Sequence, residues 1–237
     1  MIDYLCIGAA KAGTMSIIKA LNIHPDIFCK EGETHFFDEE KLTPSTIQRY
    51  ESSFNSKKKL VGEKSPSYCY LQYAIDRIYS YNPSIKLILL LREPVSRAFS
   101  HYNMLDGGRR EGAINTDNLV QLKDITRRDD HYVERGYYDE IIEYIVSKFH
   151  KDNLYIGIAE EIKANPRVEY NKIYNFLGVK DIKITSDLNI HQGTYKNTIS
   201  RDLELKLYKI YKSHNEKLYE LLGRKIDVWE NYYNSIL

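Results

Sequence analysis

Residues 7–14 read IGAAKAGT, a glycine-containing stretch of the kind that can hold a phosphate. Gly8 and Gly13 keep the spacing of the nucleotide-binding motif G-x-x-x-x-G-K-[ST], and Thr14 follows, but Lys11 lies between the glycines. Backbone N–H groups in such a loop, and the positive end of the helix after it, attract phosphate-type anions. The displaced lysine argues against ATP with magnesium. A tight turn without a ligand is the alternative for the loop alone, because short motifs match by chance.

A second candidate group follows the nearly unbroken aliphatic run at residues 85–91. Such a run is typical of a central parallel strand that is buried on both faces. It ends at Arg92, where nucleotide hydrolases and kinases commonly carry a magnesium-binding acid. Arginine cannot ligate a metal, but its planar guanidinium suits bidentate contact with a phosphate, and Ser100 two helical turns later can add a hydroxyl. An ion pair of Arg92 with Glu93 is the alternative.

Residues 30–38, KEGETHFFD, supply a third candidate group. In an extended segment Glu33 and His35 point to the same side, because side-chain direction repeats every two residues. A carboxylate and an imidazole that face one cleft are candidate proton acceptors for an attacking hydroxyl. Solvated side chains near an exposed turn are the alternative. Phe36 and Phe37 are expected in the core.

Strand and helix patterns alternate along the chain and must position these groups. The expected strands are residues 4–7, 59–61, 85–91 and 154–158, and the expected helices are residues 14–21, 68–81, 94–105, 137–149, 166–177 and 201–222. This alternation predicts an α/β fold, a P-loop-like three-layer arrangement with a central, mainly parallel sheet flanked by helices. Ligands then bind at the carboxyl ends of the strands, where residues 8–13, 64–66 and 92–94 fall.

Length and composition narrow the class of protein. A chain of 237 residues suits one sizeable core, so we expect a single domain over 1–237. The periodicity disappears over residues 106–131, which predicts a surface loop or lid. Three cysteines without a C-x-x-C pair indicate neither a disulfide framework nor a zinc cluster, and we expect them reduced.

The charge balance bears on partners and location. A net charge of +1 gives no bulk attraction to nucleic acid or to an anionic membrane, so anion binding must depend on local clusters. The basic run at residues 57–59 has no interleaved aromatic residue and is expected in a solvated loop. The sequence shows neither a secretory signal pattern nor an apolar run of about 20 residues, so we expect a cytoplasmic protein without nucleic-acid or membrane partners.

Four motifs in one order carry a family resemblance. They are KAGT at 11–14, ETHFFD at 33–38, EKSPSY at 63–68 and LREPVSRAFS at 91–100. Together they resemble sulfotransferases that use 3′-phosphoadenosine 5′-phosphosulfate (PAPS), and the likeness is to the heparan sulfate 3-O- and N-sulfotransferase branch. NEKLYELLG at 215–223, with Trp229, resembles the final helix and tail of that branch, so the resemblance covers nearly the whole chain.

The resemblance implies how the donor is held. The first loop corresponds to the segment that holds the 5′-phosphosulfate end of PAPS. The family's arginine and serine that bind the 3′-phosphate correspond to Arg92 and Ser100. The donor-binding candidates are therefore Lys11, Ala12, Gly13, Thr14, Met15, Arg92, Ser100, Gly193 and Lys196.

The resemblance also implies the catalytic groups. The family's catalytic base corresponds to Glu33, with His35 and Asp38 in assisting positions and Lys64 near the transferred group; these four residues also form the substrate-binding set. In-line displacement at sulfur would transfer the acceptor's proton to Glu33, while Lys11 and Lys64 stabilise charge on the sulfuryl oxygens and on the leaving phosphate of the product PAP. A sulfuryl group carries less charge than a terminal phosphoryl group, so no metal is expected.

The sequence departs from the branch at two places. Met15 stands where the branch has an arginine, and the branch's Lys-Gly-Arg run reads Gln192, Gly193 and Thr194 here, with Lys196 as a candidate replacement for the lost charge. These changes keep PAPS as the expected donor and make heparan itself doubtful as the acceptor. A saccharide is the first expectation by resemblance; a small-molecule natural product and a peptide tyrosine stay open.

Two other classes of function compete with sulfuryl transfer. An ATP-dependent kinase would require magnesium, and the positions of Lys11 and Arg92 argue against it. A silent nucleotide-binding protein would bind PAP without sulfating any acceptor. Glu33, His35 and Lys64 favour an enzyme over a silent protein.

Overall fold

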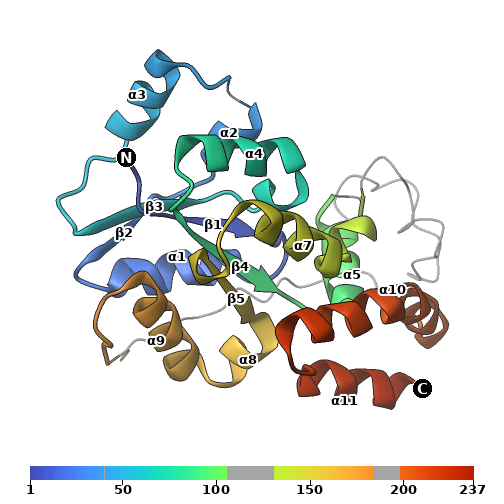
Figure 1. Cartoon of the computed structure of the whole chain (residues 1–237). Helices are drawn as coiled ribbons and strands as arrows, with labels where there is room; N and C mark the ends of the chain where they lie inside the picture. Colours follow the sequence, from blue (N-terminus) through green and yellow to red (C-terminus); the bar gives the residue numbers. More distant parts are fainter. Residues whose placement is uncertain (40, 106–130, 184–197) are drawn as a thin grey trace. The chain divides into compact units, whose positions relative to one another are not determined.

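Aliphatic runs of the sequence become the strands of one parallel sheet in the computed structural model, which describes residues 1–39, 41–105, 131–183 and 198–237 (Figure 1). The sheet has the order β2-β3-β1-β4-β5, and every pairing in it is parallel. The strands are β1 (Tyr4–Gly8), β2 (Ile27–Cys29), β3 (Leu60–Lys64), β4 (Lys86–Leu91) and β5 (Leu154–Ile158). The predicted α/β class with a central parallel sheet is confirmed.

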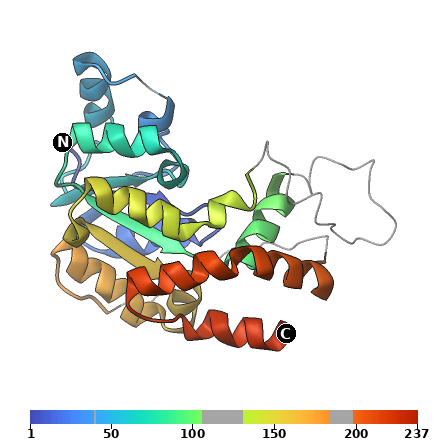
Figure 2. The same cartoon turned by 45° about the vertical axis from the view of Figure 1, so that its right-hand side comes forward.

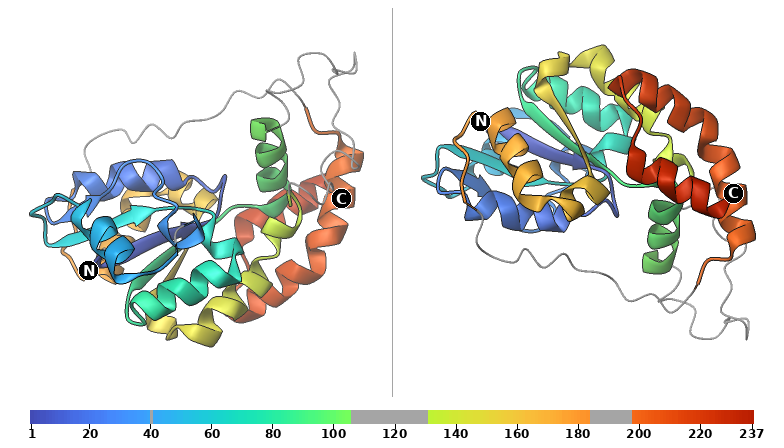
Figure 3. Two further views of the ribbon diagram at one scale, coloured as in Figure 1. Left: turned by 90° about the horizontal axis from the view of Figure 1, so that it is seen from above. Right: turned by 90° about the horizontal axis from the view of Figure 1, so that it is seen from below.

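The sheet belongs to the first of two compact units, Met1–Leu91 with Glu143–His191. Every residue of β1 is buried, as expected for a strand covered on both faces. In this unit α1 and α9 lie on one side of the sheet and α4 lies on the other (Figure 1 and Figure 3). The hydroxyl of Tyr174 on α9 donates to the carbonyl of Ala20 on α1 at 2.7 Å, which joins the two helices. The other elements of this unit are α2 (Phe36–Glu39), α3 (Pro44–Ser52), η1 (Tyr68–Tyr70), η3 (Lys151–Asn153) and α8 (Ala159–Ala164), beside α1 (Thr14–Ile23), α4 (Gln72–Tyr81) and α9 (Pro166–Leu177).

The second unit, Arg92–Ile142 with Gln192–Leu237, is helical in its described part. Its elements are α5 (Pro94–Leu105), η2 (Glu134–Gly136), α10 (Arg201–Leu222) and α11 (Asp227–Ile236), and α7 (Tyr138–Lys148) runs from this unit into the first. Figure 2 shows α10 and α11 packed side by side. Trp229 of α11 is fully buried, so the tail that resembles the heparan sulfate branch is a core element of this unit.

The predicted elements agree with the structure where a pattern is long. The bounds of β5, α9 and α10 match the prediction to the residue. The helix predicted over 68–81 is wrong in part, because Leu71 has extended backbone angles and separates η1 from α4. The short elements β2, α2, α3 and α8 were not predicted. The single domain over 1–237 stays a prediction, and the loop predicted over 106–131 lies almost wholly outside the described residues.

Two smaller predictions can also be compared with the structure. Cys6, Cys29 and Cys69 are free thiols and all are buried, as expected. Burial raises the pKa of Cys29 to about 12, so this thiol stays protonated and unreactive at neutral pH. No helix among the described residues is both long enough and apolar enough to cross a membrane.

Candidate active site

The glycine loop connects β1 to α1 and ends in a left-handed turn. Lys11 has a φ of 70° and Gly13 a φ of 83°, the region that glycine adopts without steric cost. Gly13 is the N-cap of α1, so no side chain caps the helix, and the first turn contains no acidic residue. The positive end of the α1 dipole therefore has no carboxylate of its own there, and a phosphate or sulfate group can take that place. The order of strand, glycine loop and helix is the one that the sequence predicted.

Gly8 is required by a close approach at the start of this loop. A Cβ at Gly8 would lie 2.2 Å from Sγ of Cys69, a distance that no pair of unbonded atoms tolerates. The backbone N–H of Ala10 donates to the hydroxyl of Tyr70 at 2.7 Å. The loop is therefore attached to the segment that follows β3.

The base cluster forms where β3 ends. Lys64 is the last residue of β3 and is 1% exposed, yet its ammonium group reaches Glu33 and donates to Oε1 of that carboxylate. Lys64 Nζ also lies 3.6 Å from Sδ of Met15, in the first turn of α1. The side chain of Glu33 is 38% exposed, so a solvent molecule or an acceptor group can reach it. The structure therefore brings the predicted base and its lysine together beside the helix that follows the glycine loop.

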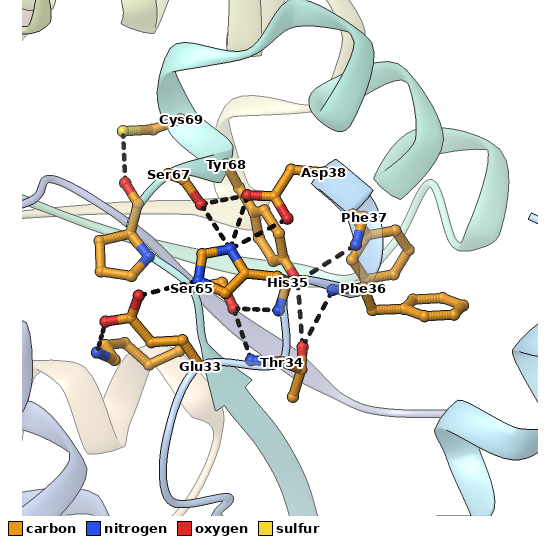
Figure 4. A network of polar contacts seen from close by, with 12 residues as sticks. Glu33, Thr34, His35, Phe36, Phe37, Asp38, Ser65, Ser67, Tyr68 and Cys69 are labelled. Atoms are coloured by element: carbon orange, nitrogen blue, oxygen red, sulfur yellow. Dashed lines mark hydrogen bonds and ion pairs between the residues drawn. The ribbon is translucent and has the colours of Figure 1, made fainter. Parts of the chain in front are cut away.

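His35 lies on the other side of Glu33 (Figure 4). Its Nε2 is 3.3 Å from Oε2 of Glu33, and its Nδ1 is 3.0 Å from Oδ2 of Asp38. The two side chains do meet, as predicted, but not through an extended segment, because His35 has a φ of 50°. The left-handed turn at His35, and not strand alternation, turns the imidazole toward the carboxylate.

Carboxylates on both ring nitrogens favour the imidazolium form of His35, because only that form has an N–H to donate on each side. Partial burial lowers the pKa of His35. The hydrogen bond and charge of Asp38, with the charges of Glu33 and Glu39, outweigh that effect, so the pKa is raised overall. The cluster is a row of alternating charge in which Glu33 lies between the ammonium of Lys64 and the ring of His35.

Asp38 also accepts a hydrogen bond from a hydroxyl: Ser67 Oγ donates to Oδ2 of its carboxylate. His35, Asp38 and Glu39 place one ligand-type atom each within 4.8 Å of one another. Acidic groups at a surface often cluster without an ion, and Nδ1 of His35 already faces Asp38. This grouping alone does not define a metal centre.

Arg92 and Ser100 belong to the second unit. Arg92 directly follows β4 and is half-buried, with its backbone carbonyl accepting from the Tyr138 hydroxyl at 2.9 Å. Ser100 lies within α5 and is fully buried. The adjacent carboxylate of Glu93 accepts from the N–H groups of Val95 and Ser96 at 2.8 and 2.6 Å. Gly193 and Lys196, the other predicted donor contacts, lie outside the described residues.

Sequence reasoning missed a buried layer beneath the base cluster. Glu63 is fully buried and accepts from the hydroxyls of Ser65 and Tyr68 at 2.8 and 3.0 Å, and from Tyr50 at 3.3 Å. Burial raises the pKa of Glu63 above its ordinary range, although the hydrogen bonds it accepts act in the opposite direction. The signal was present in the sequence as three hydroxyl-bearing residues within EKSPSY, but the backbone N–H of Thr34, which also contacts Ser65, is 31 positions away.

Comparison with known proteins assigns this chain to one family. A family model described as a sulfotransferase domain matches residues 2–223. Heparan sulfate glucosamine 3-O-sulfotransferase 5 of Mus musculus is 26% identical over 251 residues, which cover 94% of this chain and 72% of that protein. Heparan sulfate glucosamine 3-O-sulfotransferase 3B1 of Mus musculus is 24% identical, with 93% of this chain and 63% of that protein covered.

Solved structures share the fold. A sulfotransferase from Alicyclobacillus acidocaldarius superposes with a TM-score of 0.78 at 24% identity and covers 97% of this chain and 99% of its own. The sulfotransferase domain from the curacin biosynthetic pathway has a TM-score of 0.58 at 14% identity, with 95% and 99% covered. At these identities the superpositions establish the fold.

Proposed function

We propose, since this chain belongs to the sulfotransferase domain family, that it moves a sulfuryl group from PAPS to a hydroxyl or amine of an acceptor, with Glu33 as the general base. The observation that carries the proposal is the ion pair of Glu33 with Lys64 next to the first turn of α1. It combines a proton acceptor and a cation with a helix N-terminus suited to an anion. In the proposed transfer the base takes the acceptor's proton, and the cation and the helix N-terminus stabilise the negative charge of the donor.

The donor site follows from the same loop and from the family. Lys11, Gly13 and Thr14 are assigned to the 5′-phosphosulfate end, because the N-terminus of α1 is capped by glycine and has no acid in its first turn. Arg92 and Ser100 are assigned to the 3′-phosphate by resemblance. Metal neutralisation is not part of the proposal, since lysine ammonium groups supply the positive charge at the sulfuryl group.

Side chains of this protein can take the acceptor's proton and stabilise the leaving group in the proposed reaction. Glu33 accepts the proton of the attacking hydroxyl or amine while the acceptor atom forms its bond to sulfur. The bond between sulfur and the 5′-phosphate oxygen breaks, and its electron pair leaves with PAP. Lys11 and Lys64 stabilise the negative charge that grows on that oxygen. His35, held by Asp38, keeps Oε2 of Glu33 in place.

A saccharide is the proposed acceptor, on the ground of the heparan sulfate sulfotransferase relatives. The surroundings of Glu33 favour a sugar with little sulfate of its own. Exposed carboxylates at residues 31 and 39 lie close in sequence to the base, and Met15 stands where the heparan sulfate branch has an arginine. A densely sulfated chain would meet like charge there, which costs binding energy.

The experiment that tests the proposal is incubation with labelled PAPS and four acceptors: an unsulfated glucosamine oligosaccharide, heparan sulfate, a tyrosine-containing peptide and p-nitrophenol. Mass spectrometry then scores an added sulfo group. Sulfation of the oligosaccharide supports the proposal, and sulfation of the peptide or the phenol alone redirects it to another acceptor. Binding of PAP without transfer to any of the four would indicate a silent nucleotide-binding protein.

Replacing the base gives the largest expected loss of rate. Glu33→Gln removes the proton acceptor and keeps the shape of the side chain, so kcat should fall about 100- to 10,000-fold, the usual contribution of a general base. PAP should still raise the melting temperature of the variant by nearly the wild-type amount, because the donor loop is on another element. A Glu33→Gln protein with full activity would remove Glu33 as the base.

A further inference from the structure

Three hydroxyl groups of residues 65–68 reach across to the segment that carries the base and its histidine (Figure 4). The Oγ of Ser65 accepts from the backbone N–H of Thr34 at 3.1 Å and from that of His35 at 3.3 Å. Ser65 thus accepts from the backbone N–H groups of two consecutive residues, Thr34 and His35. It touches neither the Glu33 side chain nor the imidazole in these contacts.

Tyr68 makes the matching contact on the other side of the turn. Its hydroxyl accepts from the backbone N–H of Phe37 at 3.3 Å and lies 3.2 Å from Oγ1 of Thr34. With Ser65, it engages the N–H groups of three residues in a stretch of four. These donors lie before or within the first turn of α2, where no helical carbonyl is available to them.

The turn they hold is one that His35 does not favour by itself. A φ of 50° is uncommon for a residue with a side chain and persists only where the surroundings fix it. The same turn directs the imidazole between Glu33 and Asp38. The conformation of the base cluster therefore depends on groups outside residues 33–38.

Glu63 fixes the direction of the two hydroxyls. Ser65 donates to its Oε2 and Tyr68 donates to its Oε1. Because each O–H points at the buried carboxyl, the oxygen lone pairs of Ser65 and Tyr68 face the backbone N–H groups of the turn. Tyr50 donates to the same Oε1 but has no contact with the backbone of the turn among the hydrogen bonds described here.

We propose that Ser65 and Tyr68 are positioning residues for sulfuryl transfer, which hold the turn at His35 so that the imidazole and Glu33 meet. Their described hydrogen bonds are with the backbone and side chain of the turn and with the carboxyl of Glu63. The proposal rests on the proposed function for its effect on rate, and on the geometry of residues 33–38 for its effect on His35.

The kinetic test compares two tyrosine variants that each remove one hydroxyl from the same Glu63 oxygen. Tyr68→Phe breaks the contacts with the turn, and Tyr50→Phe is the matched control that leaves them intact. We expect Tyr68→Phe to lower kcat about 10-fold and Ser65→Ala about 10- to 100-fold, since small misplacements of reacting groups cost this much. The KM for PAPS should stay within about twofold, because the donor loop is a separate element.

A second readout does not depend on any acceptor. The imidazole of His35, assigned by comparison with His35→Gln, can be titrated by NMR, and the groups that face it are Glu33, Asp38, Glu39 and the hydroxyl of Ser67. In Ser65→Ala and Tyr68→Phe the pKa of His35 should fall toward its ordinary value of about 6.5, and in Tyr50→Phe it should stay at the wild-type value.

The outcomes separate the two proposals. A wild-type protein that sulfates no acceptor contradicts the proposed function, while the NMR titration still tests the positioning role. Equal kcat and equal His35 titration in Tyr68→Phe and Tyr50→Phe would overturn the positioning role. Should Ser65→Ala fail to fold, the two tyrosine variants decide alone, because each keeps its ring and loses one oxygen.

Discussion

The N-termini of α1 and α5 both follow a strand of the parallel sheet, yet they are capped differently. Helix α1 begins after Gly13, with no side-chain cap and no acid in its first turn. Helix α5 begins with Pro94, and the buried carboxylate of Glu93 accepts from the N–H groups of Val95 and Ser96. The first turn of α1 thus contains no carboxylate, whereas two N–H groups in the first turn of α5 donate to a carboxyl of the chain itself.

The difference indicates that the two proposed phosphate sites attract an anion by different means. At α1 the backbone and the helix dipole supply the attraction, so glycine is the important residue type. At α5 the first-turn donors are engaged by Glu93, so an anion there must be bound by side chains, and Arg92 is the residue with the suitable group. A glycine-rich loop was therefore the visible signal for the first site, and a single arginine for the second.

An acidic residue placed at the N-terminus of α1, as α5 has in Glu93, should cause the largest loss of donor binding. In Gly13→Asp a carboxylate would meet the 5′-phosphate at a few ångströms, where like charges cost about 4 kcal/mol at an effective dielectric constant of 20. PAP affinity measured by calorimetry should fall at least about 100-fold. Gly13→Asn is the control, since it has the same left-handed backbone cost without the charge. Equal affinity in the two variants would contradict an anion site at α1.

Removing the Arg92 side chain, which directly precedes Glu93 and α5, should cause a smaller and more selective loss of PAP binding. Arg92→Ala should weaken PAP binding about 10- to 100-fold, the value of a charged hydrogen-bonded pair. Binding of adenosine 5′-phosphosulfate, which lacks the 3′-phosphate, should change by less than about threefold. An equal loss for both nucleotides would show that Arg92 does not bind the 3′-phosphate. Arg92→Lys should recover part of the affinity, because it keeps the charge and loses the planar fork.

Replacing Glu93, the acid at the N-terminus of α5, by a neutral residue should have the smallest effect of the three, and that effect is on stability. Burial raises the pKa of Glu93 in the folded state, so stability from this group falls as pH rises above the unfolded value of about 4.3. Glu93→Gln should lower the free energy of unfolding by about 1 kcal/mol, as loss of a helix cap does. Because the wild type loses stability as pH rises, the difference in melting temperature between wild type and variant should narrow from about pH 4.5 upward. A gap that widens with pH would mean that the fold stabilises the carboxylate.

The sequence predicted long elements well because their patterns repeat. The aliphatic run of β4 and the helical spacing of α9 and α10 contain enough residues for a period to be recognised. The three-residue strand β2 has no such repeat and exists because its neighbour β3 pairs with it. Short elements were missed for this reason.

Lys58 shows how tertiary contacts overrule a local interpretation. The basic run at 57–59 was expected in a solvated loop, and for Lys58 this is wrong. Its ammonium donates to the carbonyls of Asn22, His24 and Ile27 at 3.2, 3.0 and 2.8 Å. These acceptors lie at the end of α1 and the start of β2, where a cation is favoured by the helix dipole. A run of three lysines in the sequence does not show which one finds such partners.

The sequence by itself determined the residue types and their order: glycines around Lys11, Glu33 two positions before His35, and Arg92 at the end of a buried strand. The glycine loop and Arg92 could be predicted as parts of a site because each follows an expected strand, and ligands bind at the carboxyl ends of parallel strands. Only the tertiary structure decided how Glu33 and His35 meet. Their turn is held by hydroxyls about 30 residues away, and a left-handed backbone needs outside partners that local spacing does not specify.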